Sequence, residues 1–180
     1  TFGVGQLLMA AVEENVDHIV LGLGGSATND GGCGLAAACG VRFTDAAGTE
    51  FIPTGGTLGR IARIQIDRLD SRLKDVKITA ICDIDNPLFG KNGAAYVFGP
   101  QKGASEEMVR QMDAGLVHLS DALIRDLGKD VSLLPGAGAA GGMGAGVCAC
   151  LGAKLQMGIQ TVLDMVGFDE MLKDADLVFT

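Results

Sequence analysis

Residues 19–32 read Ile19-Val20-Leu21-Gly22-Leu23-Gly24-Gly25-Ser26-Ala27-Thr28-Asn29-Asp30-Gly31-Gly32, an apolar run that continues directly into a glycine-rich loop. The apolar run is typical of a buried strand. A glycine loop between a strand and a helix lets backbone N–H groups approach an anion that side chains would otherwise hold away. This stretch therefore predicts an α/β fold with a phosphate or carboxylate site where the strand ends.

The composition is that of one globular domain and disfavours a nucleic-acid partner. Of the 180 residues, 48% are hydrophobic and 20% are charged, which is enough for a sizeable buried core. Lysine and arginine number 14 against 22 aspartate and glutamate residues, a formal net charge of −8. This balance argues against binding a polyanion over a broad surface, and aromatic residues at 4% leave little material for stacking bases.

The cysteines and the hydropathy pattern predict a cytoplasmic protein with no membrane partner. None of the five cysteines forms a Cys-x-x-Cys pair, so we expect reduced and mostly buried thiols. No apolar stretch approaches the ~18 residues needed to span a bilayer. The amino terminus also lacks the basic start of a signal peptide.

The spacing of apolar residues predicts alternating helices and strands that form a mixed sheet with flanking helices. Helices are expected over 2–15, 32–39, 105–127, 146–157 and 160–166. Strands are expected over 18–23, 61–67, 77–82 and 175–180, with a hairpin over 41–51. The strand 77–82 is more uniformly apolar than the strand 61–67 and should be central. The long helix should bury Met108, Met112, Leu116, Leu119 and Leu123.

The first glycine loop admits more than one interpretation. Gly22-x-Gly24-x-x-Ala27 after a strand fits the dinucleotide fingerprint, and Asp45 lies at about the distance of the acidic ribose ligand. A dinucleotide-dependent oxidoreductase is therefore one alternative, and a ligand-binding domain without catalysis of its own is another. Asp30 can equally cap the helix that follows the loop or contact a ligand.

A second glycine-rich segment, Pro135-Gly136-Ala137-Gly138-Ala139-Ala140-Gly141-Gly142, also has two interpretations. It either packs closely as part of a small-residue helix or forms an anion-binding nest at a helix amino terminus. A Walker A loop is absent from the sequence, so a phosphotransferase of this sequence is not a P-loop enzyme.

Charged side chains follow the second predicted strand and precede the longest helix. Asp83 and Asp85 come directly after the strand 77–82, and carboxylates at a strand end are candidate ligands of Mg²⁺. Lys102 stands between glycines before the helix that begins at Ser105, where the lysine and the helix dipole attract the same anionic group. His18 and His118 lack partners in the sequence and are expected to be structural.

Four motifs together resemble the type I glycerate kinases, in order and at similar spacing: residues 22–32, 82–90, 93–104 and 135–142. The resemblance covers essentially all 180 residues and about half of a family protein. It implies that residues 1–180 form a single α/β domain, corresponding mainly to the inserted domain of a two-domain kinase. The remainder of the parent chain is then a partner of this segment.

The resemblance further implies phosphorylation of (R)-glycerate to 2-phosphoglycerate, with ATP and Mg²⁺ as cofactors. Such a transfer depends on positioning and charge neutralisation more than on covalent chemistry. The expected catalytic residues are Asp30, Asp83 and Lys102, with Asp83 also the metal ligand. The residues expected to bind substrate or phosphate are Gly24, Gly25, Ser26, Thr28, Asn29, Asn86, Gly138, Gly141 and Gly142.

Overall fold

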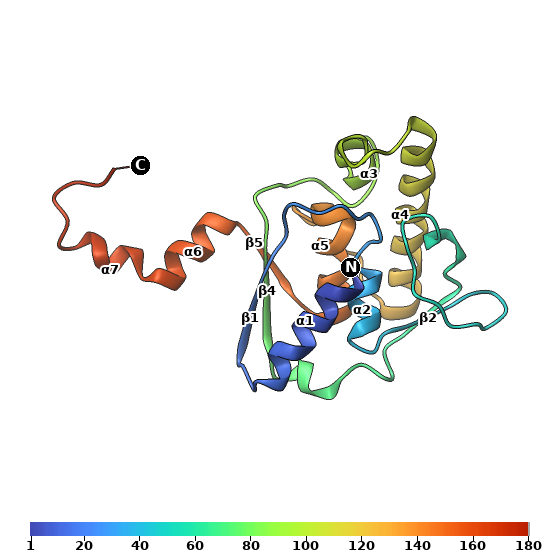
Figure 1. The fold of residues 1–180 in the computed structure, drawn as a ribbon, viewed down its shortest axis with the longest axis horizontal. Coiled ribbons are helices and arrows are strands. Elements are labelled where there is room, and N and C mark those ends of the chain that lie inside the picture. The colour runs from blue at the N-terminus through green and yellow to red at the C-terminus, as the bar shows by residue number, and fades with distance from the viewer. Residues whose placement is uncertain (180) are drawn as a thin grey trace.

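Three parallel strands form the sheet on which the candidate site is built (Figure 1). β1 (His18–Gly22) pairs with β4 (Lys77–Ile81), and β4 pairs with β5 (Lys154–Gln156). The structure, a computed structural model, describes residues 1–179. The order β1-β4-β5 places β4 in the middle, which confirms the prediction of a central strand at 77–82.

One face of this sheet is covered by three helices, α1 (Phe2–Glu13), α2 (Cys33–Ala38) and α5 (Ala139–Leu151). Leu8 of α1 and Val147 of α5 pack with Ile78 and Ala80 of β4 in one buried cluster. Burying an aliphatic side chain of this size contributes roughly 1.5–3 kcal/mol. Parallel sheets are normally covered on both faces, but among residues 1–179 no helix lies against the opposite face of this sheet (Figure 1).

A second cluster forms around the longest helix. Its elements are α3 (Ala94–Phe98), α4 (Glu106–Leu127), the antiparallel pair β2 (Arg42–Thr44) and β3 (Arg63–Gln65), and the short 3₁₀ turn η1 (Leu58–Arg60). Of the other two 3₁₀ turns, η2 (Ser71–Lys74) contributes Leu73 to the cluster at the parallel sheet, and η3 (Pro100–Lys102) follows α3. Ser105 caps α4 by accepting a hydrogen bond from the Met108 amide at 3.3 Å. The mixed α/β class is confirmed, although parallel and antiparallel strands lie in separate sheets.

The buried stripe of α4 differs from the prediction at its first turn. Leu116, Leu119 and Leu123 are buried as expected, but Met108 is 49% exposed and Val109 takes its place in the core. The helical period explains the difference, because a residue seven positions before Leu116 lies closer to its direction than one eight positions before it.

Three predicted elements are wrong within the described residues. The segment 41–51 is not a full hairpin: β2 pairs with β3, and a single bridge joins Thr44 to Glu50. The helix predicted to reach 157 ends at Leu151, because Gly152 turns left-handed and the chain continues into β5. Residues 175–179 form no strand and their side chains are exposed, while Thr180 lies outside the described residues.

The carboxyl-terminal helices α6 (Gly158–Val166) and α7 (Phe168–Leu172) extend away from the rest of the molecule (Figure 1). We call residues 157–179 the arm and residues 1–156 the body. Among residues 1–179, no helix combines the length and the apolar character required to cross a membrane.

The two glycine-rich segments pack against each other through their backbones. The Gly31 amide donates a hydrogen bond to the carbonyl oxygen of Gly141 at 3.0 Å. Ala140, Gly141 and Gly142 all have positive φ, so the chain makes a left-handed turn before α5 continues as a regular helix. A Cβ atom at Gly141 would overlap the carbonyl oxygen of Thr28. Close backbone approach therefore explains the second glycine segment.

Alanine substitutions at Gly141 and Gly152 should separate this packing demand from backbone strain. The two glycines have nearly the same φ, 69° and 68°, but a Cβ atom at Gly152 would meet no atom within 4 Å. Gly152→Ala should cost about 1–2 kcal/mol of left-handed strain, which corresponds to a Tm lower by roughly 2–8 °C. Gly141→Ala adds the overlap with Thr28 and should lower Tm by about twice as much. Equal shifts would show that the contact does not constrain the fold.

Candidate functional site

The carboxyl ends of the three parallel strands bring several predicted site residues to one edge of the sheet. The first glycine loop follows β1, Asp83 follows β4, and the first residues of α6 follow β5. Binding sites of α/β proteins collect at this edge because loops and helix amino termini converge there. Lys102, in η3, reaches the same glycine loop.

The tip of the glycine loop, Gly24 to Ser26, presents unpaired backbone donors. The last ladder bond runs from the Leu23 amide to the Ile81 carbonyl oxygen at 2.8 Å. Beyond it, no described residue accepts a hydrogen bond from the amides of Gly24, Gly25 or Ser26. Gly24 and Gly25 are exposed, and a Cβ atom at either would meet no atom within 4 Å. These two glycines therefore leave open space beside free N–H groups, as an anion requires.

Lys102 places a positive charge beside this tip. Its Nζ donates hydrogen bonds to Ser26 Oγ at 2.9 Å and to the Thr28 carbonyl oxygen at 2.7 Å. Burial lowers the pKa of the Lys102 ammonium, and the negative charge of Asp30 opposes that shift. A further N–H of the ammonium remains for a ligand.

The glycine tip and Lys102 line a cavity of about 240 Å³. This volume is below the ~300–1,000 Å³ of sites for drug-sized ligands, so it suits a small organic acid or a phosphoryl group better than a whole nucleotide. Sequence reasoning missed Ile84, Phe98, Gln101 and Ala140 in the lining. All four lie within the motifs 82–90, 93–104 and 135–142, but nothing in those motifs indicated which of their residues face the cavity.

Asp30 lies behind the cavity and acts as a helix cap. Its Oδ2 accepts hydrogen bonds from the Thr1 nitrogen at 2.9 Å and from Thr1 Oγ1 at 2.8 Å. The amides of Gly32 and Gly34 at the start of α2 donate to the same carboxylate, at 3.0 and 3.3 Å. The side chain is 8% exposed. Of the two interpretations that the sequence left open, the geometry favours the cap over a ligand contact.

Asp83 is exposed at the end of β4, and one of its two carboxylate oxygens is hydrogen-bonded. Its Oδ1 accepts a hydrogen bond from the Gly158 amide at 2.9 Å, so it caps the first turn of α6. No hydrogen bond to a described residue occupies Oδ2. Residues 1–179 contain no group of three or more His, Cys, Asp or Glu side chains that could hold a metal ion. A Mg²⁺ ion needs only one or two carboxylates when phosphate oxygens and water complete its shell, and Asp83 fits that requirement.

Six other predicted binding residues lie in or beside the contact between the glycine segments and do not line the cavity: Thr28, Asn29, Asn86, Gly138, Gly141 and Gly142. The Asn86 carbonyl oxygen accepts a hydrogen bond from the Gly138 amide at 2.9 Å. Gly138, Gly141 and Gly142 are buried against neighbouring backbone. Packing accounts for these glycines, and the geometry does not support an anion nest there.

The side chain of Asn29 is the exception among these six. It is 7% exposed, and its Nδ2 is buried without a hydrogen-bond partner among the described residues. An unpaired buried amide costs ~1–3 kcal/mol, so the fold retains an unfavourable group directly behind the loop. The site role predicted for Asn29 stays a prediction.

The dinucleotide alternative does not fit the topology. A ribose-binding carboxylate belongs at the end of a strand beside β1, but Asp45 follows β2, which lies in the separate antiparallel sheet. Its carboxylate accepts hydrogen bonds from the Ala47 and Thr49 amides, both at 3.0 Å, and pairs with Arg60. Asp45 is therefore a turn residue.

The histidines and cysteines are structural, as expected. His18 Nε2 lies 2.8 Å from Thr79 Oγ1, and His118 Nε2 lies 2.7 Å from the Ile61 carbonyl oxygen. All five cysteines are free, and burial raises the pKa of Cys150 to about 12, which disfavours a reactive thiolate.

Comparison with known proteins matches this sequence and fold to one family. The model of the glycerate kinase family matches residues 1–180. The chain belongs to the glycerate kinase family. It is 53% identical over 180 residues to the glycerate kinase of Bacillus cereus (strain ATCC 10987 / NRS 248), covering 100% of this chain and 47% of that protein. The resemblance inferred from the four motifs is confirmed.

Two further family members have similar relationships to the chain. It is 47% identical over 178 residues to the glycerate 2-kinase of Escherichia coli (strain K12), covering 99% of this chain and 47% of that protein. A crystal structure of a provisionally named glycerate kinase 2 from Salmonella typhimurium LT2 has a TM-score of 0.94 at 47% identity, covering 98% of this chain and 47% of that one. The chain spans about half the length of the curated relatives it matches.

The lowered pKa of Lys102 predicts that the free energy of unfolding rises with pH. Burial lowers this pKa below its ordinary value of 10.5. Between the folded and the unfolded pKa values, the unfolded chain therefore binds more protons than the folded chain. The free energy of unfolding consequently rises with pH in this window. The free energy of unfolding of the native chain should therefore increase relative to that of Lys102→Met as pH rises through this window. Chemical denaturation of both proteins from pH 7 to 10.5 measures the difference. A difference independent of pH would contradict the buried ammonium.

Proposed function

We propose that this chain is part of an ATP-dependent kinase that phosphorylates (R)-glycerate to 2-phosphoglycerate. The observation that carries the proposal is the set of free amides at Gly24, Gly25 and Ser26 with the Lys102 ammonium beside them. Membership of the glycerate kinase family supports the substrate. A relative named glycerate 2-kinase supports transfer to the 2-hydroxyl.

In this proposal the glycine tip and Lys102 stabilise negative charge. Glycerate carries a carboxylate, and the transferred phosphoryl group develops charge on its oxygens, so both need donors that are already in place. The amides of Gly24 and Gly25 are held by the loop backbone and need little reorganisation to bind an oxyanion. Lys102, fixed by Ser26 Oγ and the Thr28 carbonyl oxygen, neutralises the charge of the same group.

Asp83 is the residue proposed to hold Mg²⁺, through Oδ2. When bound, the ion neutralises phosphate charge. The cavity of about 240 Å³ accommodates the reacting end of the substrates, so the proposal assigns most nucleotide contacts to the part of the full-length protein outside residues 1–180. Asp30 has no catalytic role in it, because its carboxylate is taken up by the cap. A cytoplasmic location fits the supply of ATP and the five free cysteines.

Gly24→Ala in the full-length protein tests the anion cradle most directly. The φ of Gly24 is not in the left-handed region and its Cβ would meet no protein atom, so the change should leave Tm within about 1 °C. The methyl group occupies the space beside the free amides, and kcat/KM for glycerate should fall about tenfold to a hundredfold, with Lys102→Ala costing at least a hundredfold.

Gly3→Ala is the matched control for Gly24→Ala. Gly3 also has open space around its Cβ position, lies in α1 and does not line the cavity. Its turnover should equal that of the unmodified enzyme in assays of glycerate-dependent ADP release. Full activity of both Gly24→Ala and Lys102→Ala would refute the proposed site.

Substitutions of Asp83 separate metal binding from helix capping. Asn keeps an oxygen that can accept the Gly158 hydrogen bond but removes the charge, so Asp83→Asn should preserve Tm and raise the Mg²⁺ concentration for half-maximal activity at least tenfold. Asp83→Ala should show the same kinetic defect and also lose about 1 kcal/mol of capping. A normal Mg²⁺ requirement in Asp83→Asn would limit Asp83 to its capping role.

A further inference from the structure

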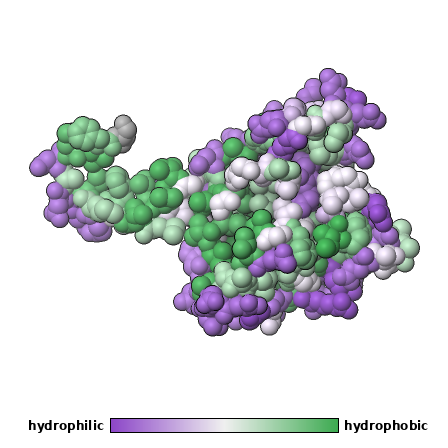
Figure 2. All heavy atoms as spheres, viewed as in Figure 1, coloured by the Kyte–Doolittle hydropathy of each residue, from purple (hydrophilic) through white to green (hydrophobic). Residues whose placement is uncertain are grey.

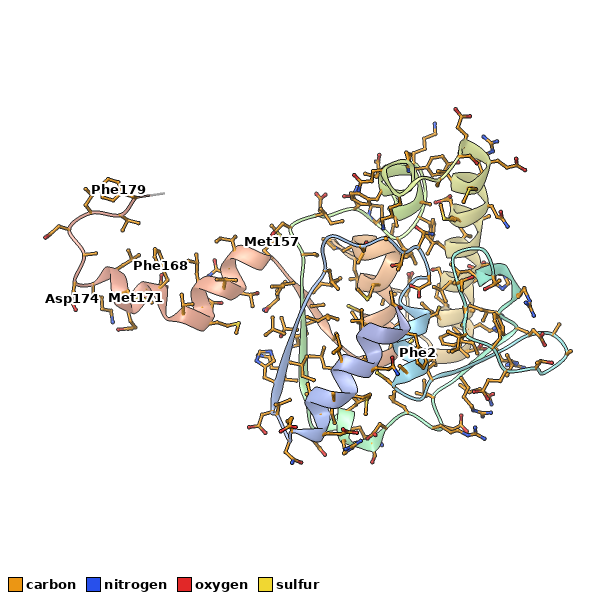
Figure 3. All side chains as sticks on the ribbon, viewed as in Figure 1. Phe2, Met157, Phe168, Met171, Asp174 and Phe179 are labelled. Carbon is orange, nitrogen blue, oxygen red and sulfur yellow. The ribbon has the colours of Figure 1, made fainter. Side chains whose placement is uncertain are left out.

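The cavity beside the glycine tip is lined by residues of the body alone. Its volume is about 240 Å³, and each lining residue lies within the segment 1–156. The arm, whose apolar surface is green in Figure 2 and whose Met171 and Phe179 lie clear of the body in Figure 3, contributes none of them. Within residues 1–179, the groups that select a substrate in this cavity therefore belong to the two glycine segments, Ile84 and the segment around Lys102.

The polar groups of the lining differ in what they can bind. The free amides of the glycine tip and the Lys102 ammonium only donate hydrogen bonds. The Ser26 hydroxyl already accepts the hydrogen bond from Lys102 Nζ at 2.9 Å. The side-chain amide of Gln101 offers both a donor and an acceptor, and neither is bonded to a residue within 1–179. Among the described lining side chains, Gln101 is therefore the one whose donor and acceptor are both unused.

The backbone of Gln101 is held in place beside the glycine tip. Gln101 is the middle residue of η3, and it follows Pro100, whose ring fixes φ. The Lys102 amide donates to the Gly99 carbonyl oxygen and the Gly103 amide to the Pro100 carbonyl oxygen, both at 3.0 Å. The Lys102 side chain ties this turn to the first glycine loop. The exposed side chain of Gln101 thus extends from a fixed position and is free to bond to a ligand.

The apolar part of the lining cannot select a hydroxylated acid by itself. Ile84, Phe98 and Ala140 border the same cavity. An apolar wall distinguishes weakly between two ligands that differ by one hydroxyl group, whereas a group that bonds to the hydroxyl rejects the analogue that lacks it. A hydroxyl group both donates and accepts hydrogen bonds, as a side-chain amide does. Gln101 is therefore the lining residue whose chemistry matches a neutral hydroxyl group.

We infer that Gln101 is a specificity-determining residue that binds the 3-hydroxyl group of glycerate, while the glycine tip and Lys102 hold the carboxylate. The inference rests on the proposed function, in which the 2-hydroxyl group receives the phosphoryl group and the 3-hydroxyl group does not react. The 3-hydroxyl group donates to Oε1 of Gln101 and accepts from Nε2. No bond to the 3-hydroxyl group changes in the reaction, so Gln101 stabilises substrate and transition state equally. The favoured substrates are 2-hydroxy acids with a second hydroxyl group on C3.

The test compares (R)-glycerate with (R)-lactate, which lacks only the 3-hydroxyl group, in the full-length protein. Gln101→Met keeps the length of the side chain and removes both its donor and its acceptor. The Kd for glycerate, measured by titration calorimetry, should rise about tenfold, the effect of losing one or two net hydrogen bonds. The Kd for lactate should stay within about twofold. In assays of glycerate-dependent ADP release, KM should rise with little change in kcat.

Gln111→Met is the matched control for Gln101→Met. Gln111 lies in α4, its side chain is also exposed, and it does not line this cavity. The same substitution there should leave the Kd values for both acids unchanged. Because both glutamines are exposed, both variants should keep Tm within about 1 °C of the unmodified protein.

Three results would overturn the inference. One is an unchanged Kd for glycerate in Gln101→Met. Another is an equal rise in Kd for glycerate and lactate, which would place Gln101 on atoms that the two acids share. A third is the absence of any preference for glycerate over lactate in the unmodified protein. If Gln101→Met does not fold, Gln101→Leu should lose the same preference, and its failure to do so overturns the inference equally.

The proposed function is judged by a different measurement, so the two can fail separately. If the unmodified protein releases ADP with glycerate but Gln101→Met retains the preference for glycerate, only the role of Gln101 is wrong. If the unmodified protein releases no ADP with glycerate but Gln101→Met loses a preference seen in Kd, the proposed reaction is wrong and the binding role of Gln101 stands.

Discussion

The backbone contact between the two glycine segments is the constraint on which the rest of the structure depends. The Gly31 amide and the Gly141 carbonyl oxygen join segments far apart in the sequence, and the absence of side chains lets α2 and α5 approach closely. A Cβ atom at Gly146 would likewise overlap the Gly31 carbonyl oxygen. Since α5 also packs on β4, this contact fixes the base of the first glycine loop relative to the sheet.

Because the base of the loop is fixed, the free amides at its tip are held in a defined position. The base, from Asn29 to Gly32, is buried and is hydrogen-bonded through the Gly31 amide, whereas the tip at Gly24 and Gly25 has free amides facing open space. The same residue type therefore serves two purposes in one loop: at Gly31 it permits close packing, and at Gly25 it leaves room for a ligand. Donors that are held in place by packed backbone lose little entropy on binding, which is the property that catalysis of phosphoryl transfer demands.

The sequence predicted the elements and loop features that depend on neighbouring residues. It did not predict features that depend on contacts with segments far away in the chain. The central strand, the Ser105 cap and the free tip at Gly24 and Gly25 follow from patterns within a few residues. The second glycine segment matched a binding motif equally well, and only its burial against Thr28 showed that packing explains it. β5 was missed because three residues carry no reliable period, and its partner lies far away in the chain. Phe98 and Ala140 lie in two of the four motifs, but only the tertiary packing shows that they line the cavity.

Asp83 connects the candidate site to the arm. Its carboxylate follows β4, next to the cavity residue Ile84, and accepts the hydrogen bond that begins α6. Because a cap fixes the direction in which a helix leaves its preceding strand, the group proposed to hold Mg²⁺ also orients α6 relative to the sheet. The two oxygens of one carboxylate are thereby divided between two tasks, with Oδ1 holding the start of α6 and Oδ2 facing the proposed ion. A neutral cap such as asparagine could perform the first task but lacks the charge that the second requires.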